Sequence, residues 1–329
     1  MAVLQAVVEP ETAGDPQSEQ KWVRSSLRSL SGRMKRAGHP ASPPTVARLL
    51  GKLGYALHVN AKKLEARAER PNRQAQFEHI AAQRTAFTAV GQPIISVDTK
   101  KKELVGNFKN GGATWSRKAT AVNVHDFPQD ALGRAVPYGI YEPLRHRGAV
   151  YVGNSADTPQ FAVDVIVRWW EDTGRMHYQA ADQLLILADG GGSNGYRARL
   201  WKQQIQEQLC DRFSLAVTVC HYPTGCSKWN PVEHRLFGPI SINWAGLPLL
   251  TWDTLLACIR GTQTTTGLVV QAFLQEGAYA TGIKVSDAVM ETLNLERHAI
   301  CPNWNYTIRP RSNDQIAATI DPVEREVVF

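Results

Sequence analysis

The stretch Pro93-Ile-Ile-Ser-Val-Asp98 is a short apolar run that ends in an acidic residue. A second run of the same kind, Leu184-Leu-Ile-Leu-Ala-Asp189, lies further along the chain. Short apolar runs that are rich in branched residues and bounded by turn formers are typical of buried strands. In a sheet where these two strands are neighbours, Asp98 and Asp189 would end at the same edge. The two runs therefore predict an α/β sheet that carries two acidic side chains at one point.

A third acidic residue lies at the start of a predicted helix. Glu233 belongs to Trp229-Asn-Pro-Val-Glu-His-Arg-Leu236, in which Pro231 favours a first helical turn. Carboxylate oxygens are the ligands that Mg²⁺ and Mn²⁺ prefer, and two such ions can align a nucleophile and a leaving oxygen at a phosphodiester. The three acids are therefore candidate catalytic residues and metal ligands of a nuclease or a transposase: Asp98, Asp189 and Glu233. Taken singly, each has an ordinary alternative as a turn former, a helix cap or a partner of the helix dipole.

Alternating strand and helix patterns surround these acids between residues 92 and 310. The expected strands are Pro93–Asp98, Glu103–Phe108, Ala149–Val152, Gln183–Ala188, Ser214–Cys220 and Asn303–Ile308. The expected helices are Asp157–Thr173, Asn194–Arg212, Thr251–Thr264 and one that begins at Pro231. This order predicts a mixed sheet flanked by helices. Residues 109–147, rich in Gly, Pro and His, are expected to form a long irregular excursion without an assigned role, and residues 311–329 a C-terminal tail.

The excess positive charge of the chain is concentrated near its N-terminus. The formal net charge is +7, yet residues 21–73 contain 13 Lys and Arg residues and only 2 acidic ones. Residues 74–329 are balanced, with 24 basic and 24 acidic residues. A basic block of this size is typical of a nucleic-acid-binding region, although a solvated charged surface gives the same composition.

Within this block, two short amphipathic segments predict a helix-turn-helix over residues 21–58. The first helix is expected from Lys21 to Met34, and Gly38-His-Pro40 ends it. The second begins at Ser42-Pro43, and its polar face presents the candidate DNA-binding residues Thr45, Arg48 and Lys52. A plain helical hairpin would have a similar pattern. Residues 1–20 are expected to be an acidic, disordered lead-in, and residues 59–91 a helical linker.

The glycine cluster after Asp189 invites a different interpretation. Gly190, Gly192 and Gly195 satisfy the GxGxxG pattern of dinucleotide-binding folds. That interpretation needs an acidic residue at the end of the next strand, but Ser214–Cys220 is followed by His-Tyr-Pro. The 5 cysteines contain no CxxC pair, and no apolar stretch approaches the roughly 20 residues that span a bilayer. We therefore expect a protein of a reducing cytoplasm, without a disulfide scaffold, a zinc motif or a membrane span.

Longer strings around the three acids resemble those of the Rhodopirellula-type DDE transposases, a family of insertion-sequence enzymes. The similarity covers about residues 9–310 and is carried by Ser96-Val-Asp-Thr-Lys-Lys-Lys-Glu-Leu-Val-Gly-Asn-Phe-Lys109, Leu187-Ala-Asp-Gly-Gly-Gly-Ser-Asn-Gly-Tyr-Arg197, His221-Tyr-Pro-Thr-Gly-Cys-Ser-Lys-Trp-Asn-Pro-Val-Glu-His-Arg-Leu-Phe237, Thr281-Gly-Ile-Lys-Val-Ser-Asp287 and Trp304-Asn-Tyr-Thr-Ile308. The resemblance implies an RNase H-like catalytic domain over residues 92–310. It also implies that Asp98, Asp189 and Glu233 are the first, second and third acids of the family triad, with two Mg²⁺ or Mn²⁺ ions as cofactors.

The expected activity is two-metal-ion cleavage of DNA strands at the ends of an insertion sequence, followed by strand transfer. Beside the acids, Lys100, Lys228 and Trp229 are candidate contacts to DNA phosphates and bases. Double-stranded DNA, as element end and as target, is the expected partner of a homo-oligomer that works at the nucleoid in the bacterial cytoplasm.

Three alternatives to this activity stay open. Family members usually carry more sequence ahead of the part that begins here near Val8, so an N-terminally shortened, immobile relic is the first. A non-catalytic helix-turn-helix DNA-binding protein is the second, because the basic block alone would suffice for it. A plain nuclease of the same fold is the third, and it would cut DNA without joining the ends.

Overall fold

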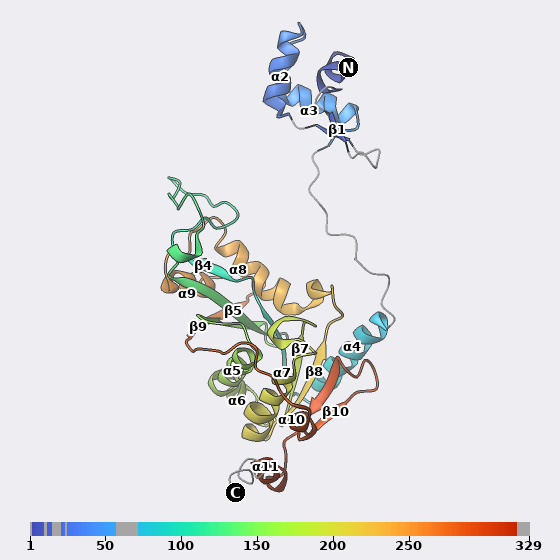
Figure 1. Cartoon of the computed structure of the whole chain (residues 1–329), viewed down its shortest axis with the longest axis vertical. Coiled ribbons are helices and arrows are strands. Elements are labelled where there is room, and N and C mark those ends of the chain that lie inside the picture. Colours follow the sequence, from blue (N-terminus) through green and yellow to red (C-terminus); the bar gives the residue numbers. More distant parts are fainter. Residues whose placement is uncertain (1, 10–11, 15–20, 24, 57–71, 321–329) are drawn as a thin grey trace, which may run out of the picture. The chain divides into compact units, whose positions relative to one another are not determined.

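The computed structural model describes residues 2–9, 12–14, 21–23, 25–56 and 72–320 (Figure 1). Contacts divide the chain into two units, residues 1–66 and 67–329, which are described separately. Within the described ranges, no helix combines the length and the apolar character that crossing a bilayer requires.

Short helices make up most of the described N-terminal unit. They are α1 (Ala2–Val8), α2 (Leu27–Arg36) and α3 (Pro43–Lys52). A short antiparallel pair, β1 (Thr12–Gly14) and β2 (Lys21–Val23), comes between α1 and α2 in the chain. Apolar residues spaced three or four apart face inward from each helix. Together they form a small core of Leu4, Val8, Leu30, Met34 and Val46.

The first helix of the predicted helix-turn-helix is shorter than the sequence pattern indicated. It begins at Leu27 rather than at Lys21, and residues 21–23 form strand β2 instead. The physical reason is the helix cap at Ser26. The Ser26 hydroxyl accepts a hydrogen bond from the Ser29 N–H at 3.2 Å, and this backbone N–H of the first turn has no partner within the helix. The prediction that a helix starts at Lys21 is therefore wrong.

The expectation of a loose lead-in over residues 1–20 is also wrong for its first part. Helix α1 lies within it, because Leu4 and Val8 find apolar partners on α2 and α3. The second helix begins at Pro43, as the Ser-Pro start indicated. Of the predicted linker, residues 59–71 lie outside the described residues.

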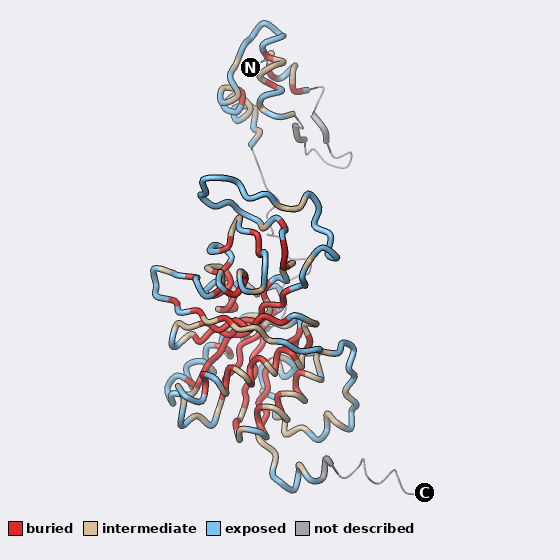
Figure 2. Tube along the Cα trace, turned by 90° about the vertical axis from the view of Figure 1, so that its left-hand side faces the viewer, coloured by how far each residue is buried: buried red, intermediate tan, exposed pale blue. Residues whose placement is uncertain are grey.

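The described part of the second unit centres on a nine-stranded mixed sheet (Figures 1 and 2). Its strands are β3 (Ile94–Thr99), β4 (Glu103–Val105), β5 (Gly133–Glu142), β6 (Arg147–Gly153), β7 (Gln183–Ala188), β8 (Ala216–His221), β9 (Val269–Gln275), β10 (Leu295–Arg297) and β11 (Asn305–Ile308). They lie in the order β10-β11-β8-β7-β3-β5-β6-β9, and β4 pairs with β5. β7 runs parallel to both β3 and β8, whereas β5 is antiparallel to β3 and β6.

Helices lie on both faces of this sheet, and α11 lies away from it (Figure 1). The helices of this unit are α4 (Arg73–Ala89), α5 (Pro159–Trp169), α6 (Arg175–His177), α7 (Arg199–Ile205), α8 (Gly238–Asn243), α9 (Trp252–Arg260), α10 (Asp287–Glu291) and α11 (Asn313–Ile320). One core lies under α5 and α7 and includes Phe161, Trp169 and Trp201. A second core, on the side of α8 and α9, includes Leu236 and Leu255. Buried residues concentrate along the sheet and the helix faces that touch it (Figure 2).

The expected irregular excursion over residues 109–147 contains the long strand β5, so that expectation is wrong there. Pro137 and Gly139 lie inside the strand, and both residues normally count against a central strand. In the structure, the Pro137 carbonyl accepts from the Lys100 N–H at 2.8 Å. Gly139 lies against Phe237, and a Cβ at this position would collide with that ring. The glycine therefore permits a helical segment to pack closely on β5.

Two flanking segments also differ from the sequence-based expectation. Helix α4, the second half of the predicted linker, packs against β3 and β7 and thus belongs to the second unit. The predicted tail 311–329 contains α11. The first residue of this tail, Arg311, forms a buried ion pair with Asp211 at 2.8 Å. Residues 321–329 lie outside the described range.

Candidate active site

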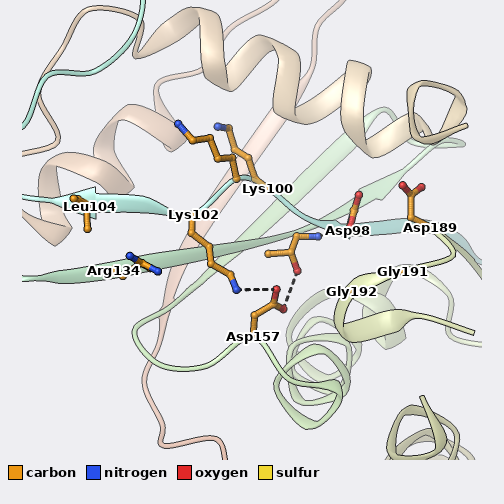
Figure 3. A pocket seen from close by; sticks show the side chains of 11 residues that line it. Asp98, Lys100, Lys102, Leu104, Arg134, Asp157, Asp189, Gly191 and Gly192 are labelled. Carbon is orange, nitrogen blue, oxygen red and sulfur yellow. Dashed lines mark hydrogen bonds and ion pairs between the residues drawn. The ribbon is translucent and has the colours of Figure 1, made fainter. Parts of the chain in front are cut away.

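Asp98 and Asp189 lie at the ends of two neighbouring parallel strands (Figure 3). Val97 pairs with Ala188 across β3 and β7, so the residues that follow them lie at the same level of the sheet. Both aspartates are half-buried. The prediction that these strands are neighbours and bring the two acids together is confirmed, because parallel strands in this register end at a common edge.

Glu233 reaches the same edge on a helical segment. A π-helical turn, Glu233–Phe237, begins there and continues into α8. The close packing of Phe237 on Gly139 holds this turn against β5, next to β3. The charge of Glu233 helps to raise the pKa of Asp98, so the two carboxyl groups lie close together. The structure thus brings together all three acids that the sequence indicated.

Burial, together with repulsion between the carboxyl groups, raises the pKa of two of them. Burial raises the pKa of Asp98 to about 8, and the charges of Asp189 and Glu233 add to the effect. The Thr99 N–H donates to Asp98 Oδ1 at 2.7 Å and offsets only part of that rise in pKa. Burial also raises the pKa of Asp189 to about 6, opposed by a hydrogen bond from Asn230. Carboxyl groups held this close resist joint ionisation unless a cation joins them.

The three acids offer hard oxygen donors suited to a divalent cation. Among the described residues, no Lys or Arg forms an ion pair with Asp98, Asp189 or Glu233. In that same part of the chain, no three His, Cys, Asp or Glu side chains already surround one point closely enough to hold an ion. An ion of the Mg²⁺ or Mn²⁺ type matches the donors in kind and would offset their mutual repulsion. The residues present therefore fit such an ion in the kind of atoms that they offer.

A cavity of about 580 Å³ opens beside the aspartates (Figure 3). Gly191 and Gly192 form part of its wall, so the glycines after Asp189 line the site without starting a nucleotide-binding helix; α7 begins later, at Arg199. The opposite wall is basic: its exposed cations are Lys101, Lys102 and Arg134, and the buried Lys100 lines it as well. The cavity therefore places acidic and basic walls next to each other, as a phosphodiester bound to metal ions would require.

Asp157 belongs to the cavity, although the sequence patterns indicated it only as a helix start. Its carboxylate accepts from the Thr99 hydroxyl at 3.1 Å and pairs with Lys102 Nζ at 3.4 Å (Figure 3). Helix α5 starts two residues later, because Thr158 caps it by accepting from the Phe161 N–H. Asp157 thus connects Thr99, next to Asp98 on β3, with Lys102 of the basic wall.

Asn230 was not among the predicted site residues, yet it touches the acid site directly. Its side-chain amide donates to Asp189 Oδ1 at 3.0 Å, and the residue is completely buried. In the sequence, an asparagine directly before Pro231 at a helix start usually indicates a helix cap. Spacing alone gives no other signal, because the partner is 41 residues away.

Lys100, a predicted DNA contact, is largely buried in the structure. Its side chain is only 9% exposed, its Nζ lies 3.4 Å from the Glu103 carboxylate, and it stacks over the Trp244 ring at 4.4 Å. Burial lowers the pKa of this ammonium. The neighbouring Lys101 is 84% exposed. Lys100 lines the cavity together with Lys101 and Lys102, but its ammonium is buried, so its role as a phosphate contact stays a prediction.

Lys228 and Trp229 lie at the surface just ahead of the third acid. The Trp229 side chain is 54% exposed, and its ring packs edge-on against Phe77 with centroids 6.0 Å apart. Lys228 Nζ lies 5.5 Å from the centre of the Trp229 ring. An exposed aromatic ring beside a cation is able to stack on a DNA base, so their role in DNA binding stays a prediction.

Thr45, Arg48 and Lys52 belong to α3 of the N-terminal unit, separate from the three acids. Arg48 and Lys52 are exposed, while Val46 of the same helix is buried. The Thr45 hydroxyl lies 3.0 Å from that of Ser42 at the helix start. The two basic side chains are therefore available on the solvent face of α3, as the sequence indicated.

The order and directions of β6, β5, β3, β7 and β8, with acids at the ends of β3 and β7 and a third on the helical segment after β8, are those of an RNase H-like domain of the DDE class. Residues 3–310 match the protein family described as Rhodopirellula transposase DDE domain. The chain belongs to this family.

Solved structures with a similar fold include complexes of the Mos1 transposase. The Mos1 paired-end complex with left transposon end is 13% identical, with a TM-score of 0.42, and the match covers 77% of this chain and 68% of that one. The Mos1 mariner paired-end complex with Mn is 14% identical, with a TM-score of 0.41 and the same coverage. No curated protein matches this sequence.

Proposed function

We propose that this member of the DDE transposase family is an active metal-dependent polynucleotidyl transferase. It would cut DNA at the ends of an insertion sequence and join the freed ends to a new site. The observation that carries the proposal is the convergence of Asp98, Asp189 and Glu233 at one edge of the sheet without a basic partner among the described residues. Three unpaired carboxylates at one point are costly unless cations bind them.

The three acids would divide the metal ligation between them. Asp98 and Asp189 end neighbouring strands, and the charge of Glu233 acts on both of them, so all three carboxylates would serve as ligands. With two ions bound, the site would activate a water or a DNA 3′-hydroxyl and stabilise the leaving oxygen of the phosphodiester.

The basic wall of the cavity would hold the DNA strand that is cut. Lys101, Lys102 and Arg134 line the cavity that Asp98 and Asp189 close. Phosphate contacts from such side chains position the backbone and carry no sequence information. Trp229 would stack on a base near the cut, since its ring is exposed beside Glu233 in the sequence.

Recognition of the element ends would fall to the N-terminal unit. Its helix α3 presents Arg48 and Lys52 to solvent and follows α2 after a short turn, an order that supports α3 as a recognition helix. Cutting and joining two ends requires both ends together, so we place the protein on double-stranded DNA as a homo-oligomer, at the nucleoid of a bacterial cell.

The test uses linear DNA that carries the ends of the protein's own element, incubated with Mg²⁺ or Mn²⁺. The purified full chain is compared with Asp189→Asn and with Asp314→Asn, which changes an exposed aspartate of α11. The expected result is metal-dependent nicking at the ends by the wild type and the Asp314→Asn control, and none by Asp189→Asn. Joined products should follow the nicks.

The other outcomes separate the alternatives. Nicking that survived in Asp189→Asn would show that the triad is assigned wrongly. DNA binding without nicking by the wild type would favour a non-catalytic DNA-binding protein or an immobile relic. Nicking without joined products would leave a nuclease.

A further inference from the structure

The side chain of Asn230 connects the strands and the helix that carry the three acids. Its amide nitrogen donates to Asp189 Oδ1 at 3.0 Å and to the Val97 carbonyl at 3.2 Å. Its amide oxygen accepts from the Ser96 hydroxyl. Its own backbone carbonyl accepts from the Glu233 N–H at 3.1 Å. One completely buried residue thus touches β3, β7 and the start of the Glu233 helix.

This hydrogen-bond pattern leaves the Asn230 amide one orientation. Both of its N–H groups meet oxygens that cannot donate, the Val97 carbonyl and the Asp189 carboxylate. Turning the amide over would set its oxygen against both of them and lose the Ser96 hydrogen bond. A buried amide with every group satisfied holds its neighbours at fixed distances, since an unmet partner in this place would be costly.

Ser96 completes the connection from the other side. Its hydroxyl donates to Asn230 and accepts from the Val232 N–H at 2.9 Å, a donor of the first helical turn. Ser96 lies two residues before Asp98 on β3, and alternate residues of a strand share one face. The same face of β3 therefore carries the catalytic acid and the anchor of the helix that brings in Glu233.

A helix cap does not account for Asn230. In a cap, the side-chain oxygen accepts from an N–H of the first turn. Here that N–H, from Val232, goes to Ser96, and the Asn230 oxygen also faces Ser96. The Asn230 N–H groups instead point at Asp189 and at the backbone beside Asp98.

From this geometry, and resting on the proposed function, we propose that Asn230 is a positioning residue of the metal site. It holds Asp189 by Oδ1, which leaves Oδ2 for a metal ion, and it sets the spacing between the aspartates and Glu233. Ser96 holds Asn230 in turn. Groups that orient metal ligands through a hydrogen bond typically change metal affinity or activity by about 10–100-fold when they are removed.

The test compares Asn230→Ala with Asn305→Ala in the full chain. Asn305 is also a completely buried asparagine with several hydrogen bonds, but it bonds to Gln76 and the Ile300 carbonyl and to none of the three acids. Both variants should lose thermal stability, because each leaves buried partners unmet. Mn²⁺ binding to the protein alone is followed by the electron paramagnetic resonance signal of free Mn²⁺, and end cleavage is titrated with Mn²⁺.

Asn230→Ala should need about 10–100-fold more Mn²⁺ for half-saturation in both measurements, while Asn305→Ala should titrate like the wild type. Ser96→Ala, a smaller change, should shift in the same direction, and it provides the test if Asn230→Ala does not fold. Equal Mn²⁺ dependence of the wild type, Ser96→Ala and Asn230→Ala would overturn the inference. A wild type that neither binds Mn²⁺ nor cuts would instead refute the proposed function.

Discussion

Val97 on β3 pairs with Ala188 on β7 in parallel register, and each is followed by an aspartate. The two acids therefore share one edge of the sheet by the geometry of the strands, before any side-chain interaction is considered. Glu233 joins them from the helical segment that packs on Gly139. Strand pairing and helix packing thus bring three acidic side chains to one place, and several measurable properties follow from their closeness.

The stability of the metal-free protein should fall as the pH rises. Burial raises the pKa of Asp98 to about 8 and that of Asp189 to about 6, both above the ordinary 3.8. At pH values between the ordinary pKa and the raised ones, the folded protein therefore binds more protons than the unfolded chain. Stability is then highest at low pH within this window and is lost as the pH climbs through the folded pKa values. Thermal melts in EDTA from about pH 5 to about pH 8 measure this, and Asp98→Asn should show a flatter profile. Parallel profiles for the two proteins would contradict the raised pKa of Asp98.

Mn²⁺ should reverse this loss of stability. The ion and protons compete for the same carboxylates, so the rise in melting temperature on adding Mn²⁺ should be larger at about pH 8 than at about pH 6. Asp98→Asn and Asp189→Asn should lose most of the rise, and Asp314→Asn should keep it. Differential scanning fluorimetry gives the melting temperatures. A rise of the same size in all four proteins would mean that Mn²⁺ binds elsewhere.

Removal of the basic wall should weaken DNA binding and leave metal binding unchanged. Lys102→Ala and Arg134→Ala each remove a cation that lines the cavity. Each should make the negative slope of log affinity against log salt less steep, by about 1. Arg175→Ala, which removes an exposed cation on α6, is the charge-matched control. Fluorescence anisotropy with end DNA at several salt concentrations measures the slopes.

Lys100→Ala serves as a contrast in the same experiment, since Lys100 packs on Trp244 and pairs with Glu103. It should lower the melting temperature without changing the salt slope. If instead Lys100→Ala alone changed the slope, the assignment of the phosphate contacts to the outer wall would be wrong.

Substitutions on α3 should separate end binding from chemistry. Arg48→Ala with Lys52→Ala should weaken binding to end DNA and reduce the salt slope by about 2, with Mn²⁺ binding by the catalytic unit unaffected. Lys35→Ala, an exposed lysine of α2, is the control within the same small unit. Anisotropy and Mn²⁺ titration are measured on the same samples. Unchanged DNA affinity in the double variant would remove α3 from the interface.

Strands whose residues are apolar and uninterrupted could be located from the sequence. Gln183–Ala188 has the predicted bounds, and Ile94–Thr99 lies within one residue of them, because a buried parallel strand needs a continuous apolar run. β5 was missed since Pro137 and Gly139 interrupt its pattern, and only the ring of Phe237 explains the glycine. The strands β9 and β10 were missed as well. Leu295–Arg297 is three residues long, and pairing with β11 alone makes it a strand.

The sequence by itself determined which acids could form the site, because each follows a local signal: an apolar run before Asp98 and Asp189, and a helix start before Glu233. Local patterns also located the basic face of α3. Only the tertiary structure decided that Lys100 is buried against Trp244 and that Asn230 connects the acids. Asn230 bonds to Asp189, 41 residues away, and to Ser96, 134 residues away. Contacts over such separations depend on strand order and helix packing, which no short stretch of sequence encodes.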